Sequence, residues 1–507
     1  MNSEAIRRYA QEVARQVGRP TVYDSLGRRA LYVASAPGVF FWGGEHAVLH
    51  GAPAVCQKVP LRVWAWISEQ KNDGGPRIRL SPDPNDHIAY DPSANDWKGG
   101  FSPLRGEETS TFTEWDSVNE AMEYLNKWVA QLNPTRHFML RTFHEISPGS
   151  GCNWSGAFAA ATVACVMAAT RELEPKDLER WSPDFVSSEQ QSDGLVRFHR
   201  AAWKMESVLH EGRASGYGTL CSVVKTPGPV LYMTADRGLD NSRVPSNVGA
   251  QLDLLDDVPF AMKSLAALRA DQHWDAAERP INYGLVYSGT PKGTGRAVRG
   301  TEQLTEDYEG ALAGNLGKLL RGEELEFVRR DNQRLRQIAE GKVKPKDLRD
   351  EQVLSLGTSA VWIAGALLGL FEASESKDDS KAFEATRSLA EAMRRTQGGL
   401  SQLGLDRGLE GQDDITHVAA AIYRWARQRG CVRETAVKTT GGGRGGQLLF
   451  MAPKLQNVAR TLQQSLQDVR TLLNNDSVGV TWTRDVDGLD TQGLRLEQCL
   501  QVGGTFE

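Results

Sequence analysis

The stretch from Ser147 to Ala157, SPGSGCNWSGA, constrains this chain most, because it concentrates glycine and serine between two regular elements. Residues 138–143 before it have the pattern of a strand, and residues 155–170 after it have the strongly apolar, alanine-rich character of a buried helix. Glycine lets the backbone approach a bound group closely, and the free N–H groups of a first helical turn point toward that group. The stretch therefore predicts either an anion site or a tight turn ahead of a buried helix.

Composition places the chain among soluble globular proteins. Its 507 residues suffice for two or three domains, and 40% hydrophobic with 24% charged residues is ordinary for this class. The net charge of −5 gives no reason to expect nucleic acid or an anionic membrane as a partner. No export signal is visible, and the most apolar run, Ala157 to Ala169, is shorter than the about 20 residues that span a bilayer. We therefore expect a cytoplasmic protein with neither membrane nor nucleic-acid partner.

The six cysteines are scattered along the chain, with no CxxC pair and no Cys/His cluster. This spacing argues against a zinc site or a disulfide framework and fits a reducing compartment. Cys152 lies inside the glycine stretch, but no neighbouring histidine marks it as a nucleophile.

Hydrophobic periodicity predicts an α+β chain, with strands and helices alternating in the first half and helices dominating later. The predicted strands cover residues 31–35, 61–67, 138–143, 220–224, 229–234, a segment from 282, 436–439, 447–451 and 478–483. The predicted helices cover residues 1–20, 118–132, 155–170, 192–211, 302–340, 351–373, 381–403, 413–429 and 455–473. Residues 71–115 are rich in Pro, Asp, Gly and Trp, which is typical of an irregular excursion or a hairpin insert.

A second glycine-rich loop, Gly441 to Gly446, lies between two predicted strands. It contains GxGxxG, but a strand rather than a helix follows it, so the context of a dinucleotide fingerprint is missing. The P-loop motif and the protein-kinase motifs are absent from the sequence. A flexible surface hairpin is a weak explanation for five glycines, which carry a heavy entropy cost. The two glycine loops together indicate convergence on one polyanion.

Phosphoryl transfer from a nucleotide needs a phosphate cradle, magnesium ligands and a positioned acceptor. Ser155 at the start of the predicted helix offers a hydroxyl, and Glu206 on the next helix offers the hard carboxylate oxygen that Mg²⁺ prefers. Taken alone, Glu206 is better explained as a solvated helix residue.

Four segments, in this order, resemble the motifs of the GHMP kinases, the superfamily of galactokinase, homoserine, mevalonate and phosphomevalonate kinases. They are residues 36–55 with Gly44-Glu-His, which look most like mevalonate kinase, residues 148–157, residues 287–294 (YSGTPKGT), and residues 437–446 (VKTTGGGRGG). The resemblance implies ATP and Mg²⁺ as cofactors and phosphorylation of a hydroxyl or phosphate on a small metabolite.

It also implies a two-domain α+β fold, with a ribosomal-S5-like α/β domain followed by a ferredoxin-like α+β domain. We place the N-terminal domain at about 1–235 with an insert at about 68–115, and the C-terminal domain at about 236–453. Residues 454–507 are then a helix and strand extension docked on one of the two domains, where a homodimer contact is one option.

Carried over position by position, the resemblance assigns a set of site residues. ATP would contact Gly149, Ser150, Gly151, Cys152, Asn153, Ser155 and Gly156, and Mg²⁺ would be held by Ser155 and Glu206. The substrate would contact Glu45, His46, Ser215, Gly442 and Gly443.

Departures from the family pattern leave the transfer step open. Val39 stands where these kinases have a catalytic lysine, Gly218 stands where they have an aspartate base, and Asn153-Trp154 replace Gly-Ser. Three accounts remain. In the first, transfer proceeds by positioning and electrostatics, and Arg444 or Lys292 supplies positive charge. In the second, Tyr217, His46 or Glu45 acts as the base; in the third, the fold serves as a nucleotide or metabolite sensor.

Overall fold

The structure is a computed structural model of the chain. It describes residues 30–49, 53–70, 75–80, 88–91, 96–99, 114–146, 148–181, 185–188, 194–210, 214–226, 228–234, 255, 258, 260–265, 280–289, 345–402, 414–441, 446–484 and 493–498. The predicted helices over 1–20 and 302–340 lie outside these residues.

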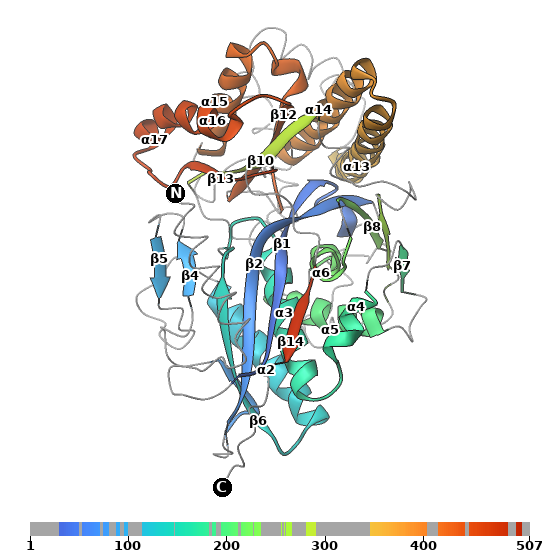
Figure 1. The fold of residues 1–507 in the computed structure, drawn as a ribbon, viewed down its shortest axis with the longest axis vertical. Helices are drawn as coiled ribbons and strands as arrows, with labels where there is room; N and C mark the ends of the chain where they lie inside the picture. Colours follow the sequence, from blue (N-terminus) through green and yellow to red (C-terminus); the bar gives the residue numbers. More distant parts are fainter. Residues whose placement is uncertain are drawn as a thin grey trace.

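Two sheets organise the described residues, as Figure 1 shows. The larger contains β1 (Ala30–Gly43), β2 (Ala54–Gln70), β3 (Ile78–Leu80), β4 (Ile88–Asp91), β5 (Asp96–Gly99), β6 (His137–His144), β7 (Phe185–Ser187), β8 (Val230–Thr234), β9 (Phe260–Ser264) and β14 (Arg495–Gln498). Its order is β5-β4-β6-β2-β8-β9-β7, with β1 pairing β2 and β14, and β3 pairing β6. The smaller sheet has the order β11-β12-β10-β13, with β10 (Ile281–Tyr287), β11 (Ala436–Thr439), β12 (Gln447–Pro453) and β13 (Gly479–Thr483).

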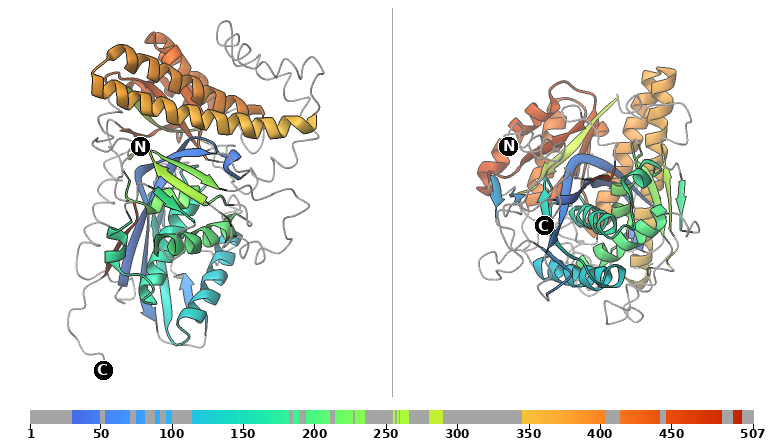
Figure 2. Two further views of the ribbon diagram at one scale, coloured as in Figure 1. Left: turned by 90° about the vertical axis from the view of Figure 1, so that its right-hand side faces the viewer. Right: turned by 60° about the horizontal axis from the view of Figure 1, so that its bottom comes forward.

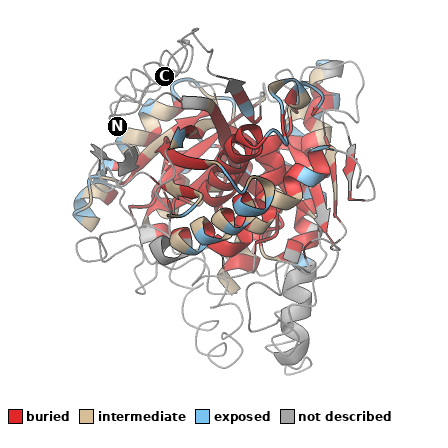
Figure 3. Ribbon diagram, turned by 90° about the horizontal axis from the view of Figure 1, so that it is seen from below, coloured by how far each residue is buried: buried red, intermediate tan, exposed pale blue. Residues whose placement is uncertain are grey.

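Helices pack beside the larger sheet around a fully buried central helix. They are α2 (Glu114–Leu132), α3 (Trp154–Ala169), α4 (Pro175–Glu179), α5 (Gly194–Leu209) and α6 (Tyr217–Val223). All sixteen residues of α3 are buried, because small side chains on every side let it pack on β1 and β2 as well as on α5 and α6. Figure 3 shows this buried interior, with exposed residues on the outer faces of the helices.

A second group of helices accompanies the smaller sheet. It comprises α13 (Pro345–Ser376), α14 (Asp379–Gln402), α15 (Asp414–Gln428), α16 (Val458–Ser465) and α17 (Gln467–Leu473), with short 3₁₀ turns η1 (Ala47–Leu49) and η4 (Val432–Glu434) elsewhere. The long helices α13 and α14 pack side by side (Figure 2). Within the described part of the chain, the stretch Ser355–Ser374 of α13 is long and apolar enough to cross a membrane. Its residues are 65% buried, which is typical of a core helix.

The two sheets are joined through the end of β1. The backbone N–H of Phe41 donates to Thr440 Oγ1 at 3.0 Å, and Lys438 Nζ donates to the Phe41 carbonyl at 3.0 Å. Aromatic rings from both sheets, Phe40, Trp42, Tyr283 and Trp482, pack together at the same junction. The described cores are therefore continuous across the junction, and the first motif lies in it.

Most predicted elements are present, with three instructive differences. Residues 220–224 were expected to be a strand, but they belong to helix α6, since a short apolar run does not by itself distinguish strand from buried helix. The described parts of the 68–115 insert extend the first sheet, because β3 and β4 pair with β6. The C-terminal extension, expected to dock on one domain, supplies β13 to the smaller sheet and β14 to the larger one (Figure 1).

Candidate functional site

The first glycine loop follows β6 and enters α3 through backbone conformations that favour glycine. Gly149, Gly151 and Asn153 have φ values of 71°, 82° and 56°, in the left-handed region. The loop is tied to the first sheet, because Val39 N–H donates to the Cys152 carbonyl at 3.0 Å. A Cβ on Gly151 would lie 2.7 Å from the Thr440 carbonyl oxygen, so glycine is required there by space as well as by conformation.

The second glycine loop contacts the first, and their convergence on one polyanion stays a prediction. Gln447 N–H donates to the Ser150 carbonyl at 2.7 Å, and a Cβ on Gly446 would lie 2.5 Å from that same oxygen. The described end of the second loop at Gly446 is therefore held against the first glycine loop at Gly149 and Ser150. Three residues assigned to this loop, Gly442, Gly443 and Arg444, and also Lys292, lie outside the described residues.

At the N-terminus of α3, a buried carboxylate is held by hydroxyls from two helices. Ser155 Oγ on α3 donates to Glu206 Oε1 at 3.3 Å, and the Thr219 hydroxyl on α6 donates to Glu206 Oε2. His210 Nε2 lies 2.8 Å from Ser155 Oγ at the end of α5. We call Ser155, Glu206 and Thr219 the carboxylate corner. The structure brings the predicted pair Ser155 and Glu206 together, whereas Thr219 and His210 were not anticipated.

Burial raises the pKa of Glu206 to about 7, against the opposing effect of the Thr219 and Ser155 hydroxyls. A carboxylate so placed is stabilised in its charged form by a cation. Among the described residues no group of three or more His, Cys, Asp or Glu side chains is placed to hold a metal. One carboxylate with hydroxyl oxygens fits Mg²⁺, which proteins often bind through one or two carboxylates together with substrate phosphates.

A second set of contacts, between the start of α3 and α6, contains no charged residue. The Asn153 side chain donates from Nδ2 to Ser222 Oγ on α6 at 3.3 Å. A Cβ on Gly156 or on Gly218 would overlap the Asn153 carboxamide. We call Asn153, Gly218 and Ser222 the amide corner. Gly218, the position expected to carry an aspartate, therefore lies beside the first glycine loop. The Asn153 carboxamide, which comes from that loop, fills the space next to it.

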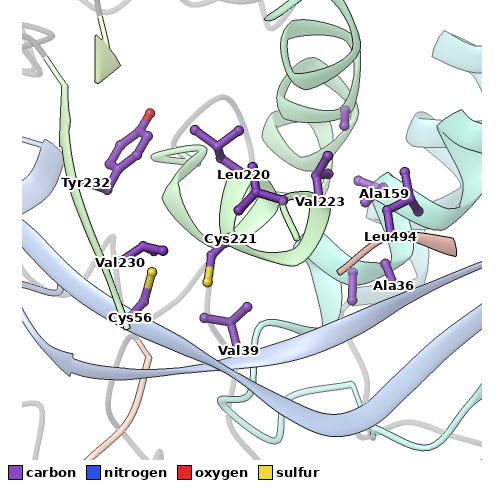
Figure 4. Close-up of a cluster of buried hydrophobic side chains, with 14 of the residues drawn as sticks. Ala36, Val39, Cys56, Ala159, Leu220, Cys221, Val223, Val230, Tyr232 and Leu494 are labelled. Atoms are coloured by element: carbon purple, nitrogen blue, oxygen red, sulfur yellow. The ribbon is translucent and has the colours of Figure 1, made fainter. Parts of the chain in front are cut away.

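The position expected to carry a lysine belongs to the packed core. Val39 is fully buried on β1 and faces α6 near Cys221 (Figure 4). Its cross-strand partner is Lys58 on β2, which is also buried. The Lys58 ammonium donates to the Val224 carbonyl at 3.1 Å and to the Thr226 carbonyl at 2.8 Å, so its charge supports the end of α6.

The predicted substrate residues near the junction are largely committed to protein contacts. Glu45 is buried and forms an ion pair with Lys438 of β11; burial lowers the pKa of Lys438, and Glu45 opposes that shift. The Ser215 carbonyl accepts from the Tyr232 hydroxyl at 3.2 Å. His46 adopts φ 60° in the turn that follows β1. Lys438 was missed in the sequence, where its place in VKTTGGG, directly before the second loop, was the available signal.

Tyr217 begins α6 and packs on Phe41, with ring centroids 4.5 Å apart. Burial raises the pKa of Tyr217 well above its usual value, and the negative charge of Glu45 adds to the shift. The phenol is therefore neutral near pH 7, which suits a hydrogen-bond donor better than a base.

Comparison with protein-family models and with curated proteins finds no match. Among solved structures, the chain is similar to Streptococcus pneumoniae phosphomevalonate kinase in complex with phosphomevalonate and AMPPNP (13% identity, 89% of this chain, 98% of that chain, TM-score 0.45). It is also similar to Methanococcus jannaschii mevalonate kinase (12%, 92% and 98%, TM-score 0.44) and to Lactococcus lactis galactokinase complexed with galactose (12%, 89% and 95%, TM-score 0.46). All three are GHMP kinases, the superfamily that the sequence motifs resemble.

Proposed function

We propose that this protein is an ATP-dependent small-molecule kinase of the GHMP type, which transfers a phosphoryl group to a hydroxyl or phosphate of a metabolite. The carboxylate corner carries the proposal: a buried carboxylate with a raised pKa lies at the first turn of α3, directly after a glycine loop. A raised pKa in such a position is typical of functional sites. Two sheets with their own helices support a two-domain layout, and we propose that the first domain is S5-like and the second ferredoxin-like.

In this mechanism the glycine loop and the first turn of α3 bind the triphosphate through backbone N–H groups, as helix N-termini bind phosphates. Ser155 and Glu206 would hold Mg²⁺, and the Thr219 hydroxyl would orient the carboxylate. The bound Mg²⁺ supplies charge neutralisation on the phosphates. The second glycine loop is proposed to contact the phosphates, and Arg444 and Lys292 are proposed to bring positive charge to the transferring group.

Release of ADP tests this function. Purified protein with Mg-ATP would be supplied with mevalonate, phosphomevalonate, galactose and other small metabolites, and ADP would be measured with a coupled assay. We expect ADP release on at least one acceptor and none without Mg²⁺. Binding of Mg-ATP without ADP release on any acceptor would favour a nucleotide sensor, and absence of nucleotide binding would contradict both.

A further inference from the structure

Two thiols that are far apart in the sequence meet in the core behind the carboxylate corner. Cys56 lies on β2 and Cys221 lies on α6; both are fully buried, and their sulfur atoms point toward one another (Figure 4). The Cys56 thiol donates a hydrogen bond to the Cys221 sulfur, and both cysteines are free thiols. Two cysteines can be joined in a disulfide only where their side chains face one another, and this pair meets that requirement.

The strand that carries Cys56 is fixed, whereas the helix that carries Cys221 is not part of a sheet. At Cys56, β2 is paired on both sides, with β1 at Phe41 and with β8 at Val230. A strand paired on both sides cannot shift without loss of its ladder hydrogen bonds. Helix α6 is only seven residues long and packs on β2 through side chains. Because a covalent bond brings two sulfurs closer together than a hydrogen bond does, a disulfide would draw α6 toward β2.

The opposite side of α6 carries a contact of the carboxylate corner. Thr219 lies two residues before Cys221, and side chains two residues apart in a helix point about 200° apart. Cys221 therefore faces β2, while Thr219 faces α5, where its hydroxyl donates to Glu206. Movement of α6 toward β2 takes this hydroxyl away from the carboxylate.

The surroundings of the pair favour one reactive thiolate. Burial opposes ionisation of Cys221, but the hydrogen bond from Cys56 and the nearby charge of Lys58 lower the pKa of Cys221 below its usual value. Burial and the hydrogen bond to Cys221 raise the pKa of Cys56 well above its usual value. Since the thiolate is the nucleophile in thiol oxidation, Cys221 is the attacking sulfur and Cys56 the resolving one.

We propose that Cys56 and Cys221 form a redox switch, in which hydrogen peroxide joins the two thiols in a disulfide and α6 withdraws Thr219 from Glu206. Hydrogen peroxide is small and uncharged, so it is the class of oxidant that suits two buried thiols. A disulfide that forms transiently is also the kind found in reducing compartments. The cross-link depends only on the packing of the two thiols, whereas its effect on Mg-ATP binding rests on the proposed kinase function.

The oxidation balances in two steps. The Cys221 thiolate attacks one peroxide oxygen, the O–O bond breaks, and a sulfenic acid and hydroxide form; the hydroxide takes up the proton that Cys221 released. The Cys56 sulfur then attacks the sulfenic sulfur, the S–O bond breaks, and the leaving hydroxyl takes the Cys56 proton as water. Two thiols are oxidised to one disulfide, and one hydrogen peroxide is reduced to two waters.

Peptide mapping tests the cross-link without any ligand. The folded full-length protein would be treated with hydrogen peroxide, its remaining thiols alkylated during unfolding, and its digest analysed by mass spectrometry. We expect a peptide pair joined through Cys56 and Cys221 that dithiothreitol separates. If peroxide leaves both residues to be alkylated, or converts Cys221 to a sulfinic acid without a cross-link, the proposal is overturned.

Two cysteine variants show which thiols are responsible. Cys431→Ala removes another buried thiol, beside the smaller sheet, and should retain both the cross-link and the response of Mg-AMPPNP binding to peroxide. Cys56→Ala should lose both. A response to peroxide as large in Cys56→Ala as in the wild type would contradict the proposal, and peptide mapping of the wild type decides the matter if Cys56→Ala does not fold.

Calorimetric titration with Mg-AMPPNP tests the effect on the site. We expect the oxidised wild type to bind about ten-fold more weakly than the reduced form, because a hydrogen bond to a charged group is lost, and dithiothreitol should restore the affinity. Thr219→Val removes the same hydroxyl and should weaken binding by the reduced protein to a similar extent. Oxidation should then add little in that variant.

The outcomes of this titration separate the switch from the proposed function. Equal affinities of the reduced and the fully cross-linked wild type would contradict the switch. Absence of Mg-AMPPNP binding in both states would instead contradict the proposed kinase function, while peptide mapping still decides whether Cys56 and Cys221 are joined.

Discussion

The carboxylate corner and the amide corner both link α3 to α6, and the first adds Glu206 from α5; the two corners differ in charge. In the first, Glu206 is buried and held by the hydroxyls of Ser155 and Thr219. In the second, Asn153 reaches Ser222 across two glycines without any ionisable group among the three residues that define the corner. A buried carboxylate costs stability unless a cation completes it, whereas a hydrogen-bonded amide does not. The proposed Mg²⁺ site therefore lies at the first corner and not at the second.

The Lys438–Glu45 ion pair is a buried link between β11 of the smaller sheet and the turn that follows β1. We expect Lys438→Met to destabilise the protein by about 3–5 kcal/mol, because Glu45 is left as a buried charge. Urea denaturation followed by circular dichroism measures the change. The double variant with Glu45→Gln should recover much of the loss; a double variant as unstable as the single one would mean that charge pairing is not the cause.

The variant Glu206→Gln removes the negative charge from the carboxylate corner. The amide retains hydrogen-bonding atoms for Ser155 and Thr219 but is a much poorer magnesium ligand, so turnover of Mg-ATP should fall at least ~100-fold with little change in Tm. Glu172→Gln, beyond the opposite end of α3, is the matched control and should retain activity. Parallel loss of Tm and activity in Glu206→Gln would identify Glu206 as structural.

The variant Gly151→Ala tests the close packing of the first glycine loop. Its φ of 82° and the nearby Thr440 carbonyl predict a loss of about 2 kcal/mol in the free energy of unfolding, with weaker nucleotide binding. Gly365→Ala in α13, where a Cβ meets nothing within 4 Å, should instead be neutral or stabilising by about 0.5–1 kcal/mol. Denaturant unfolding of both variants measures the two changes in the free energy of unfolding. Equal changes would argue against close packing at Gly151.

A third buried polar group, His199 of α5, gives the smallest effect and belongs to neither corner. Burial among Trp203 and Phe260 lowers the pKa of His199 to about 3, with Arg200 adding to the shift. The unfolded chain then binds more protons than the folded one between about pH 3 and 6.5, so stability is lost as pH falls below 6.5. By pH 5 the contribution is about 2 kcal/mol. His199→Phe should remove that part of the pH dependence, and an unchanged slope of stability against pH would refute this assignment.

The glycine loop and α3 could be predicted from local sequence, because they are determined by their own residues. The pairing of Ser155 with Glu206 was expected only from the resemblance to the GHMP kinases, since the residues around Glu206 do not indicate it. Lys438 and Thr440 contact β1 from about 400 residues away in sequence, and no local pattern indicates which strand they meet.

The amide corner was beyond sequence reasoning for a different physical reason. Read one position at a time, Gly218 is a missing acid and Asn153 is an altered loop residue. Only the three-dimensional packing shows that the space lost at one is filled by the other. The same holds for Val39 and Lys58, where the cross-strand register places a buried charge beside a buried valine.

The central claim is tested most directly by titrating wild-type protein and Glu206→Gln with AMPPNP in a calorimeter, with Mg²⁺ present and with Mg²⁺ removed by EDTA. The account predicts binding by the wild type that Mg²⁺ strengthens at least ten-fold, and no such strengthening in Glu206→Gln. Equal affinity in all four titrations, or no binding in any of them, would contradict it.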